Sequence, residues 1–321
     1  MNQHFIDLHV HSDQSDGTLS PEDVVKRAYD KHLCAIALTD HDTIQGITRA
    51  KKAAHLLPSP LEVISGVEIS AAYKQRDIHI LGLFVDETNE TFRTTLENAV
   101  ANRDARNEKM ARRFQELGIP LTLEALRTQS PNTVITRAHF ARYLIEHHYV
   151  KTNEEAFERY LGYHAPCFIP REYMEPETAI SLILSAGGIP VLAHPLLYKL
   201  PADELEALLV RLKNAGLVGL EVLYSANTNC DENILRSYAN RYGFLMTGGS
   251  DFHGANKPQI EIGSGRGNLK IPETILDTLK QYLEKNVKKS HSKGDSRDIT
   301  NAYYLNLNRI LDQNQKALWG I

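Results

Sequence analysis

The sequence contains few cysteines, and these lie far apart. Cys34, Cys167 and Cys230 form no C-x-x-C pair. This spacing argues against both a zinc ribbon and a disulfide framework, and is typical of proteins that fold in a reducing compartment. We therefore expect a cytoplasmic protein.

Long apolar runs and an excess of basic charge are also missing. No stretch approaches the roughly 18 uninterrupted apolar residues that a membrane-spanning helix needs, and the amino terminus lacks the pattern of a signal peptide. The formal net charge is -4, so the chain as a whole does not attract a polyanion. We expect no membrane contact and no obligate protein partner, and a function that comes from a local site.

Seven short runs of apolar and β-branched residues alternate with amphipathic segments of helical spacing. The runs cover residues 5–11, 34–39, 61–67, 78–85, 189–193, 219–223 and 245–249. Apolar strands separated by helical crossovers predict parallel pairing. Ser20 and Pro21 begin one of these helices with a capping pattern, and segments 175–188 and 202–216 repeat the helical pattern. The sequence therefore predicts an α/β fold, either a seven-stranded barrel or a related layered architecture.

The alternation stops between residues 91 and 169, where a long charged segment of helical spacing precedes shorter ones. We interpret this stretch as a helical insertion that divides the barrel into residues 1–90 and 170–287. Residues 288–321 begin as a polar, basic segment, and we expect a linker followed by one further helix.

Side chains that are able to bind metal ions follow or interrupt the predicted strands. They are His9, His11, Asp16, Asp40, His41, Glu68, His79, His194, Asp251 and His253. Barrel enzymes carry their active sites at the carboxy-terminal ends of the strands, so we expect these residues on one rim. Each of them alone would more often be a hydrogen-bonded core or turn residue. Together, however, they would be costly to bury without a shared partner, and metal ions supply one.

The donor types indicate which metals are suitable. His9 and His11 are two residues apart in an extended segment, so their rings point the same way and one metal ion can bridge them. Mixed nitrogen and oxygen ligands suit manganese, iron or zinc, and a carboxylate such as Glu68 can bridge two ions.

Six ordered segments resemble the PHP (polymerase and histidinol phosphatase) domain superfamily: DLHVHS with Asp16, LTDHDT, GVEIS, DIHILG, AHP and GSDFHG. The resemblance covers nearly the whole chain outside the insertion and the tail, and it implies a distorted seven-stranded (β/α) barrel that holds three divalent ions. By this resemblance one ion is bound by His9, His11, Glu68 and Asp251, a second by Glu68, His79 and His194, and a third by Asp16, His41 and His253. We expect Asp40, His41, His194 and His253 to take part in catalysis, with Asp40 behind the ligands or carrying a proton.

Within the superfamily the chain is similar to the YciV/TrpH-type branch, which includes 3',5'-nucleotide bisphosphate phosphatases and the 5'-to-3' exoribonuclease RNase AM. Asp16, the insert with TRAHFARYL, and the segments GGIPVLAHP and GSDFHG carry this likeness. It implies a metal-dependent phosphoesterase that acts on nucleoside 3',5'-bisphosphates or short 5'-phosphorylated RNA, with Mn²⁺ as the expected metal and Fe²⁺ or Zn²⁺ as alternatives. A histidinol-phosphate phosphatase and a non-catalytic, metal-stabilised module are the alternative interpretations.

A nucleotide substrate with a second phosphate needs an anchor away from the metals. Guanidinium binds phosphate through two hydrogen bonds, so Arg137, together with His139, is the candidate for a 5'-phosphate clamp. The alternative for Arg137 is a surface ion pair on a helix. Lys257 and Arg171 are further candidates for substrate binding, and Ser12 and Gly17 are expected to line the pocket.

Overall fold

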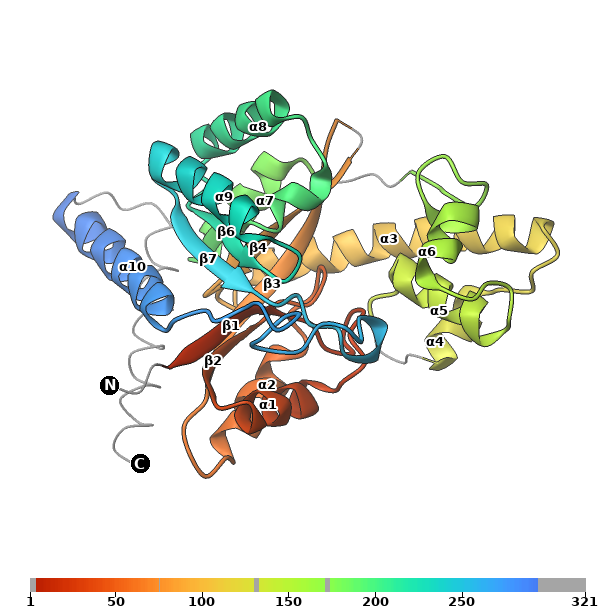
Figure 1. The fold of residues 1–321 in the computed structure, drawn as a ribbon, viewed down its shortest axis with the longest axis horizontal. Coiled ribbons are helices and arrows are strands. Elements are labelled where there is room, and N and C mark those ends of the chain that lie inside the picture. The colour runs from red at the N-terminus through yellow and green to blue at the C-terminus, as the bar shows by residue number, and fades with distance from the viewer. Residues whose placement is uncertain (1–3, 75, 130–132, 171–173, 294–321) are drawn as a thin grey trace.

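A computed structural model describes residues 4–74, 76–129, 133–170 and 174–293. Its centre is one seven-stranded sheet that curls into a nearly closed barrel, with the strands in chain order (Figure 1). The strands are β1 (Phe5–Val10), β2 (Leu33–Leu38), β3 (Glu62–Tyr73), β4 (Arg76–Leu83), β5 (Ile189–Leu192), β6 (Gly219–Tyr224) and β7 (Leu245–Gly249). Val10 bridges to Phe252 just beyond β7, so the two ends of the sheet meet. The predicted seven-stranded α/β barrel is confirmed.

The expectation that all strands are parallel is wrong at β4. This strand pairs antiparallel with both β3 and β5. Only two residues separate Tyr73 from Arg76, which leaves no room for the crossover helix that parallel pairing requires. β3 also continues to Tyr73, so Glu68 lies inside the strand and does not follow it as predicted. Because β4 runs in reverse, its first residues lie at the same rim as the last residues of the parallel strands.

Helices cover the outside of the barrel on the side of β1 and β2. α1 (Pro21–Asp30) begins as predicted, because the Ser20 side chain accepts a hydrogen bond from the backbone N–H of Asp23 at 3.1 Å. In β2, Ile36 and Leu38 pack with α1 and α2 (Ile47–His55), whereas the alternate residues pack with the other strands. This period of two is what a strand with both faces buried requires.

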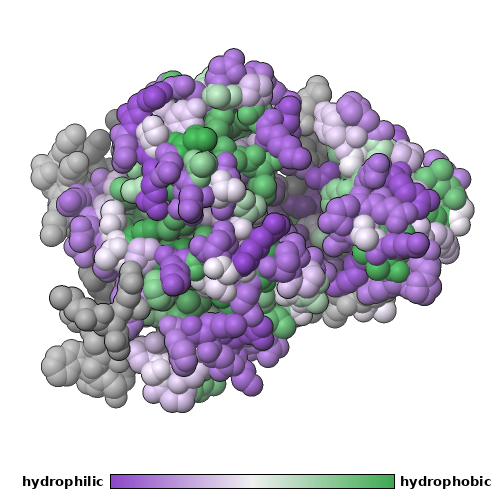
Figure 2. Space-filling model, viewed as in Figure 1, coloured by the Kyte–Doolittle hydropathy of each residue, from purple (hydrophilic) through white to green (hydrophobic). Residues whose placement is uncertain are grey.

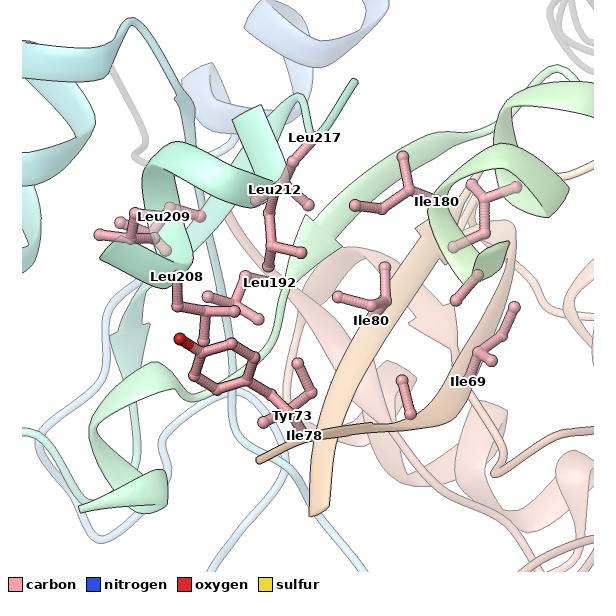
Figure 3. Close-up of a cluster of buried hydrophobic side chains, with 14 of the residues drawn as sticks. Ile69, Tyr73, Ile78, Ile80, Ile180, Leu192, Leu208, Leu209, Leu212 and Leu217 are labelled. Atoms are coloured by element: carbon pink, nitrogen blue, oxygen red, sulfur yellow. The ribbon is translucent and has the colours of Figure 1, made fainter. Parts of the chain in front are cut away.

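A second apolar cluster covers β3, β4 and β5. Figure 3 shows Ile69, Ile80 and Leu192 of these strands facing Ile180 of α7 (Pro176–Ser185) and Leu212 of α8 (Ala202–Asn214). All five side chains are fully buried. Each contributes about 1.5–3 kcal/mol of hydrophobic stabilisation. α9 (Asn229–Tyr242) adds its own buried side chains to the same cluster over β6.

Between β4 and β5 the described residues form helices and turns but no strand. Before α7, the helices of this stretch are α3 (Glu90–Glu116), α4 (Leu123–Gln129), α5 (Arg137–Glu146), α6 (Asn153–Ala156) and a short π-helix (Phe157–Leu161). They pack around a separate apolar cluster, in which the rings of Phe114 and Phe140 stack with centroids 5.9 Å apart. Figure 1 shows the long α3 leaving the barrel and α4–α6 gathered along its far part. This group of helices, which we call the insertion, stands beside the barrel rim.

α10 (Thr274–Lys293) follows β7 and covers the amino-terminal end of the barrel. Leu276, Leu279 and Leu283 pack with Ile6 and Ile189, which stand at the starts of β1 and β5. The helix continues to Lys293, whereas we expected a linker from residue 288; the rest of that segment, 294–321, lies outside the described residues. Among the described residues, no helix is both long and apolar enough to cross a membrane.

Candidate metal centre

The nine predicted metal ligands converge at one rim of the barrel. They are His9 in β1, His11 and Asp16 after it, His41 after β2, Glu68 in β3, His79 in β4, His194 after β5, and Asp251 and His253 after β7. All are buried except His41 and His79, which are partly exposed. His79 reaches this rim from the first half of its strand because β4 runs antiparallel to its neighbours.

Glu68 stands at the centre of the cluster. Its Oε2 lies 3.2 Å from both His11 Nε2 and His41 Nδ1, and 3.4 Å from His9 Nε2. Its Oε1 lies 2.8 Å from His79 Nδ1 and 3.0 Å from His194 Nε2. A carboxylate whose two oxygens face different imidazoles has the geometry of a ligand that bridges two ions.

Two aspartates complete the cluster on the side of β1 and β7. Asp16 Oδ1 lies 3.1 Å from His253 Nε2, and Asp16 Oδ2 lies 3.7 Å from His41 Nε2. Asp251 Oδ1 lies 3.4 Å from His11 Nε2. The donors form overlapping groups whose atoms lie within 4.8 Å of one another: His11–Asp16–His41–His253, His9–His11–Asp251, His9–Glu68–His194 and His41–Glu68–His79.

Several buried atoms of this cluster have no hydrogen-bond partner among the described residues. They are His9 Nε2, His11 Nε2, Asp16 Oδ1, His41 Nδ1 and His194 Nδ1. A buried polar atom without a partner costs on the order of 1–3 kcal/mol. Cations would pair with all of these atoms at once, and a mixture of imidazole nitrogen and carboxylate oxygen suits first-row divalent metals. The residues present therefore fit a cluster of divalent metal ions.

A layer of polar groups behind the ligands sets the orientation of their rings. Glu221 accepts a hydrogen bond from His9 Nδ1 at 2.9 Å through one oxygen and from the backbone N–H of His194 at 2.7 Å through the other. His253 Nδ1 lies 2.8 Å from the backbone oxygen of Asp251. A ring nitrogen that is held in this way leaves the opposite nitrogen free for a metal.

Asp40 belongs to this supporting layer and does not line the cavity. Its carboxylate accepts hydrogen bonds from the Ser12 backbone N–H at 2.8 Å, the Ser12 hydroxyl at 2.6 Å and the Ser15 hydroxyl at 2.6 Å. Ser15 Oγ lies 3.5 Å from His11 Nδ1. Burial raises the pKa of Asp40, against the effect of nearby His11 and these hydrogen bonds. These contacts place Asp40 behind the predicted ligands, which is one of the two positions expected for it.

The ligands shift one another's pKa values. Burial alone would raise the pKa of Glu68, but His79, His41 and His9 lower it well below its usual range. Burial would lower the pKa of His11, yet Asp251 and Glu68 raise it to about 9. Burial lowers the pKa of His41 to about 3. At neutral pH Glu68 is therefore ionised and His41 is neutral, whereas His11 carries a proton that a bound metal ion would have to displace.

Two of the ligands have a strained backbone. His194 has φ +27° and Asp251 has φ +58°, a region that side chains with a Cβ rarely occupy. His194 follows the end of β5 and Asp251 follows the end of β7, both at the rim of the barrel. Such strain is found where the surrounding structure needs a side chain in a particular place.

The cluster lies on one side of a cavity of about 740 Å³ between the barrel rim and the insertion. Figure 2 shows a hollow there, with mainly hydrophilic residues around it. Asp16, His41, His79 and His253 line the cavity together with cationic side chains, which are Arg103, Arg106, Arg137, Lys151, Lys257 and Arg266. A polyanion small enough to enter would meet metal ligands and positive charge together.

The residues expected to bind substrate differ in their placement. Arg137 lines the cavity, where its Nη2 lies 2.5 Å from Asp77 Oδ2, and its guanidinium lies over the rings of Phe157 and Phe168. Lys257 also lines the cavity, and its Nζ lies 2.6 Å from Asp251 Oδ2. Arg171 lies outside the described residues.

Ser12, Gly17 and His139 do not line this cavity. Ser12 is fully buried and bonded to Asp40, and a Cβ on Gly17 would lie only 2.6 Å from the backbone oxygen of His11, so Gly17 is packed against the chain. His139 Nδ1 accepts a hydrogen bond from the Thr136 backbone N–H at 3.0 Å, within the capping box that begins α5. Burial lowers the pKa of His139 to about 4. His139 thus caps α5 as a neutral imidazole and stands outside the lining of the cavity that would receive a phosphate.

Comparison with known protein families matches residues 7–174 to the PHP domain. The chain belongs to the PHP domain family.

Relatives of this PHP chain bear the names of phosphoesterases. It is 38% identical over 276 residues to the 5'-3' exoribonuclease of Haemophilus influenzae, covering 86% of this chain and 98% of that protein. It is 32% identical over 259 residues to the 3',5'-nucleoside bisphosphate phosphatase of Chromobacterium violaceum, and the match covers 80% of this chain and 90% of that protein. A Bifidobacterium adolescentis protein described as a candidate metal-dependent phosphoesterase has a similar structure, with a TM-score of 0.77 and 29% sequence identity. The match covers 86% of this chain and 95% of that protein.

The sequence did not reveal the buried carboxylates that hydrogen-bond the candidate metal ligands and the backbone next to them. Glu221 is fully buried in a strand whose other residues are also buried. Asp7, equally buried, accepts hydrogen bonds from the backbone N–H groups of Ser250 and Gly263 at 2.8 and 2.7 Å. A single acidic residue inside an apolar strand was the available signal in both cases, because a carboxylate is rarely buried without partners.

Proposed function

We infer that the protein is a metal-dependent phosphoesterase that acts on 5'-phosphorylated nucleotides and RNA. Its substrates are nucleoside 3',5'-bisphosphates, from which it removes the 3'-phosphate, and RNA, from which it releases 5'-mononucleotides in the 5'-to-3' direction. The observation that carries this conclusion is a cluster of nine metal-binding side chains that adjoins a cavity with cationic walls. The names of the relatives support the same chemistry.

Three divalent ions, most suitably Mn²⁺, are the proposed cofactors. His9, His11, Glu68 and Asp251 would hold one ion, Glu68, His79 and His194 a second, and Asp16, His41 and His253 a third. Such ions lower the pKa of water and neutralise charge on a phosphate. The chain's own contribution is to fix the ligands through Glu221 and the Asp40 network and to orient the substrate.

The substrate is oriented by Arg137 through its 5'-phosphate in this proposal. Arg137 is held in the cavity by Asp77, and its guanidinium keeps donors for an incoming phosphate. Lys257, beside Asp251, contributes further positive charge. A cytoplasmic location accompanies this function, supported by three free cysteines that are far apart in the sequence.

One bond cleavage accounts for both activities. Water attacks the 3'-phosphorus, the P–O3' bond breaks, and the 3'-oxygen of the clamped nucleotide takes up a proton. If the phosphate carries nothing else, the products are a 5'-nucleotide and inorganic phosphate. If it carries an RNA chain, that chain leaves with a new 5'-phosphate and can be clamped in turn.

A substrate panel tests the proposal. The purified protein with Mn²⁺ would be incubated with adenosine 3',5'-bisphosphate, a 5'-phosphorylated oligoribonucleotide and histidinol phosphate, and the products identified by chromatography. We expect AMP from the first and 5'-mononucleotides from the second. Hydrolysis of histidinol phosphate alone would contradict the proposal, and so would inactivity on all three with metal analysis showing the ions bound.

A further inference from the structure

A glycine-rich turn at residues 263–267 holds Arg266 at the cavity. The three glycines of the turn have φ values of +73°, +58° and +89°, which other residues rarely adopt. A Cβ on Gly265 would lie 2.7 Å from Ser225 Oγ, so the turn lies directly against the end of β6. Arg266 itself is exposed and lines the cavity.

The turn is anchored to the barrel on both sides of Arg266. Before it, the backbone N–H of Gly263 donates to Asp7 Oδ2 at 2.7 Å. After it, the Asn268 side chain accepts from the Arg266 backbone N–H at 3.1 Å and donates to the Ser225 backbone oxygen at 3.3 Å. The backbone that carries Arg266 is therefore fixed, and only its side chain is left to move.

Three of the other cationic side chains at the cavity are paired with carboxylates, whereas Arg266 has no carboxylate partner among the described residues. Arg103 is paired with Asp42, Arg137 with Asp77, and Lys257 with Asp251. Within the described part of the chain, the Arg266 side chain makes neither an ion pair nor a hydrogen bond. A guanidinium with all its donors available is well suited to bind a phosphate through two hydrogen bonds.

Arg266 and Arg137 belong to different walls of the cavity. Arg137 begins α5 of the insertion and contacts Asp77 in β4. Arg266 lies in the segment after β7, against the end of β6. The metal ligands His41 and His253 line the cavity with them. A chain that is clamped at Arg137 and cleaved at the metal cluster would leave along the wall of Arg266.

We propose that Arg266 binds the RNA backbone beyond the scissile phosphate, and that it determines how strongly the enzyme prefers RNA to nucleoside bisphosphates. This inference rests on the proposed function, in which Arg137 receives the 5'-phosphate. A nucleoside 3',5'-bisphosphate ends at the scissile phosphate and has no further phosphate for Arg266 to bind. An RNA trinucleotide has one further phosphodiester on that side.

The test compares kcat/KM for adenosine 3',5'-bisphosphate with kcat/KM for a 5'-phosphorylated RNA trinucleotide in the Mn²⁺-loaded protein and in Arg266→Ala. Loss of a phosphate contact to an exposed arginine is expected to lower the ratio of trinucleotide to bisphosphate activity about tenfold. Lys270→Ala is the matched control, because Lys270 is an exposed cation in the same segment that does not line the cavity. It should leave the ratio at the wild-type value.

Salt dependence gives a second measurement that a structural defect would not reproduce. The slope of log kcat/KM against log salt for the trinucleotide should become shallower in Arg266→Ala by roughly 0.7, the value for one phosphate contact on a single strand. Equal losses on both substrates, or an unchanged ratio and slope, would show that Arg266 has no such role while leaving the proposed function intact. Inactivity of the wild-type protein on both substrates would instead overturn the proposed function.

Discussion

At the scale of single residues, Glu221 connects two of the predicted metal ligands. One oxygen holds the ring of His9 and the other holds the backbone of His194. Glu221→Gln keeps the size of the side chain but replaces one acceptor with a donor, so one of these contacts is lost. We expect metal affinity to fall by roughly 10- to 100-fold. Isothermal titration with Mn²⁺ measures this, and Glu284→Gln, at an exposed position on α10, should bind like the wild type.

Arg137 is the second residue whose role can be isolated. Arg137→Ala should raise KM for adenosine 3',5'-bisphosphate by roughly tenfold or more, because a charge-assisted contact with phosphate is lost. Hydrolysis of a generic aryl phosphate, which has no second phosphate, should change little. Steady-state kinetics on both substrates decide the matter, since equal losses would mean that Arg137 only supports the structure through Asp77.

At the scale of elements, the start of α5 depends on a neutral histidine. Burial lowers the pKa of His139 to about 4, below the value of about 6.5 in an unfolded chain. The unfolded state therefore binds the proton more tightly, and stability falls as the pH drops from 6.5 towards 4, by up to about 1.4 kcal/mol per pH unit.

His139→Gln tests this contribution, because glutamine also accepts a hydrogen bond at the third position of a capping box. The loss of unfolding free energy between pH 7 and pH 5, measured with urea, should be smaller in this variant than in the wild type. His55→Gln, at an exposed position in α2, serves as the control. An identical loss in all three proteins would mean that His139 is charged in the folded state.

The insertion is tied to the barrel by a buried ion pair. Arg103 of α3 contacts Asp42, which also accepts a hydrogen bond from the Ser70 backbone N–H at 2.9 Å. Arg103→Met would leave the buried Asp42 carboxylate without its cation, so we expect a loss of roughly 3–5 kcal/mol of unfolding free energy. The double variant with Asp42→Asn should recover part of this loss. If the two substitutions were additive in denaturant unfolding, the pair would not be coupled.

At the scale of the whole molecule, the ligands come from parts of the chain that are far apart, so bound ions should hold the barrel together. One ion at a free concentration 100 times its Kd contributes about 2.7 kcal/mol. A chelator should therefore lower Tm by several degrees and abolish phosphoesterase activity, and Mn²⁺ should restore both. Calorimetry together with elemental analysis checks this prediction. An unchanged Tm after complete removal of the ions would contradict it.

The sequence predicted the positions of the strands and the convergence of the candidate metal ligands better than it predicted the direction of β4 and the residues that hold the candidate ligands in place. His9, His11 and the acidic residues near strand ends were recognisable because such groups are rarely buried without a function. The antiparallel direction of β4 could not be recognised from the sequence. Lys74, after Tyr73, has φ +47°, but the turn contains no glycine or asparagine, which are the usual sequence signals of a tight hairpin. Glu221 was missed because its role depends on His9 and His194, which only the folded chain brings near it.

The insertion enters the chain after His79 and ends before His194, so none of the nine predicted metal ligands lies within it. The residues that would break the phosphate ester and the helices that form one wall around the substrate are therefore encoded separately. Evolution could replace those helices and change which phosphate esters are accepted without disturbing the ions. The same separation offers a protein engineer a boundary at which one set of helices can be exchanged for another.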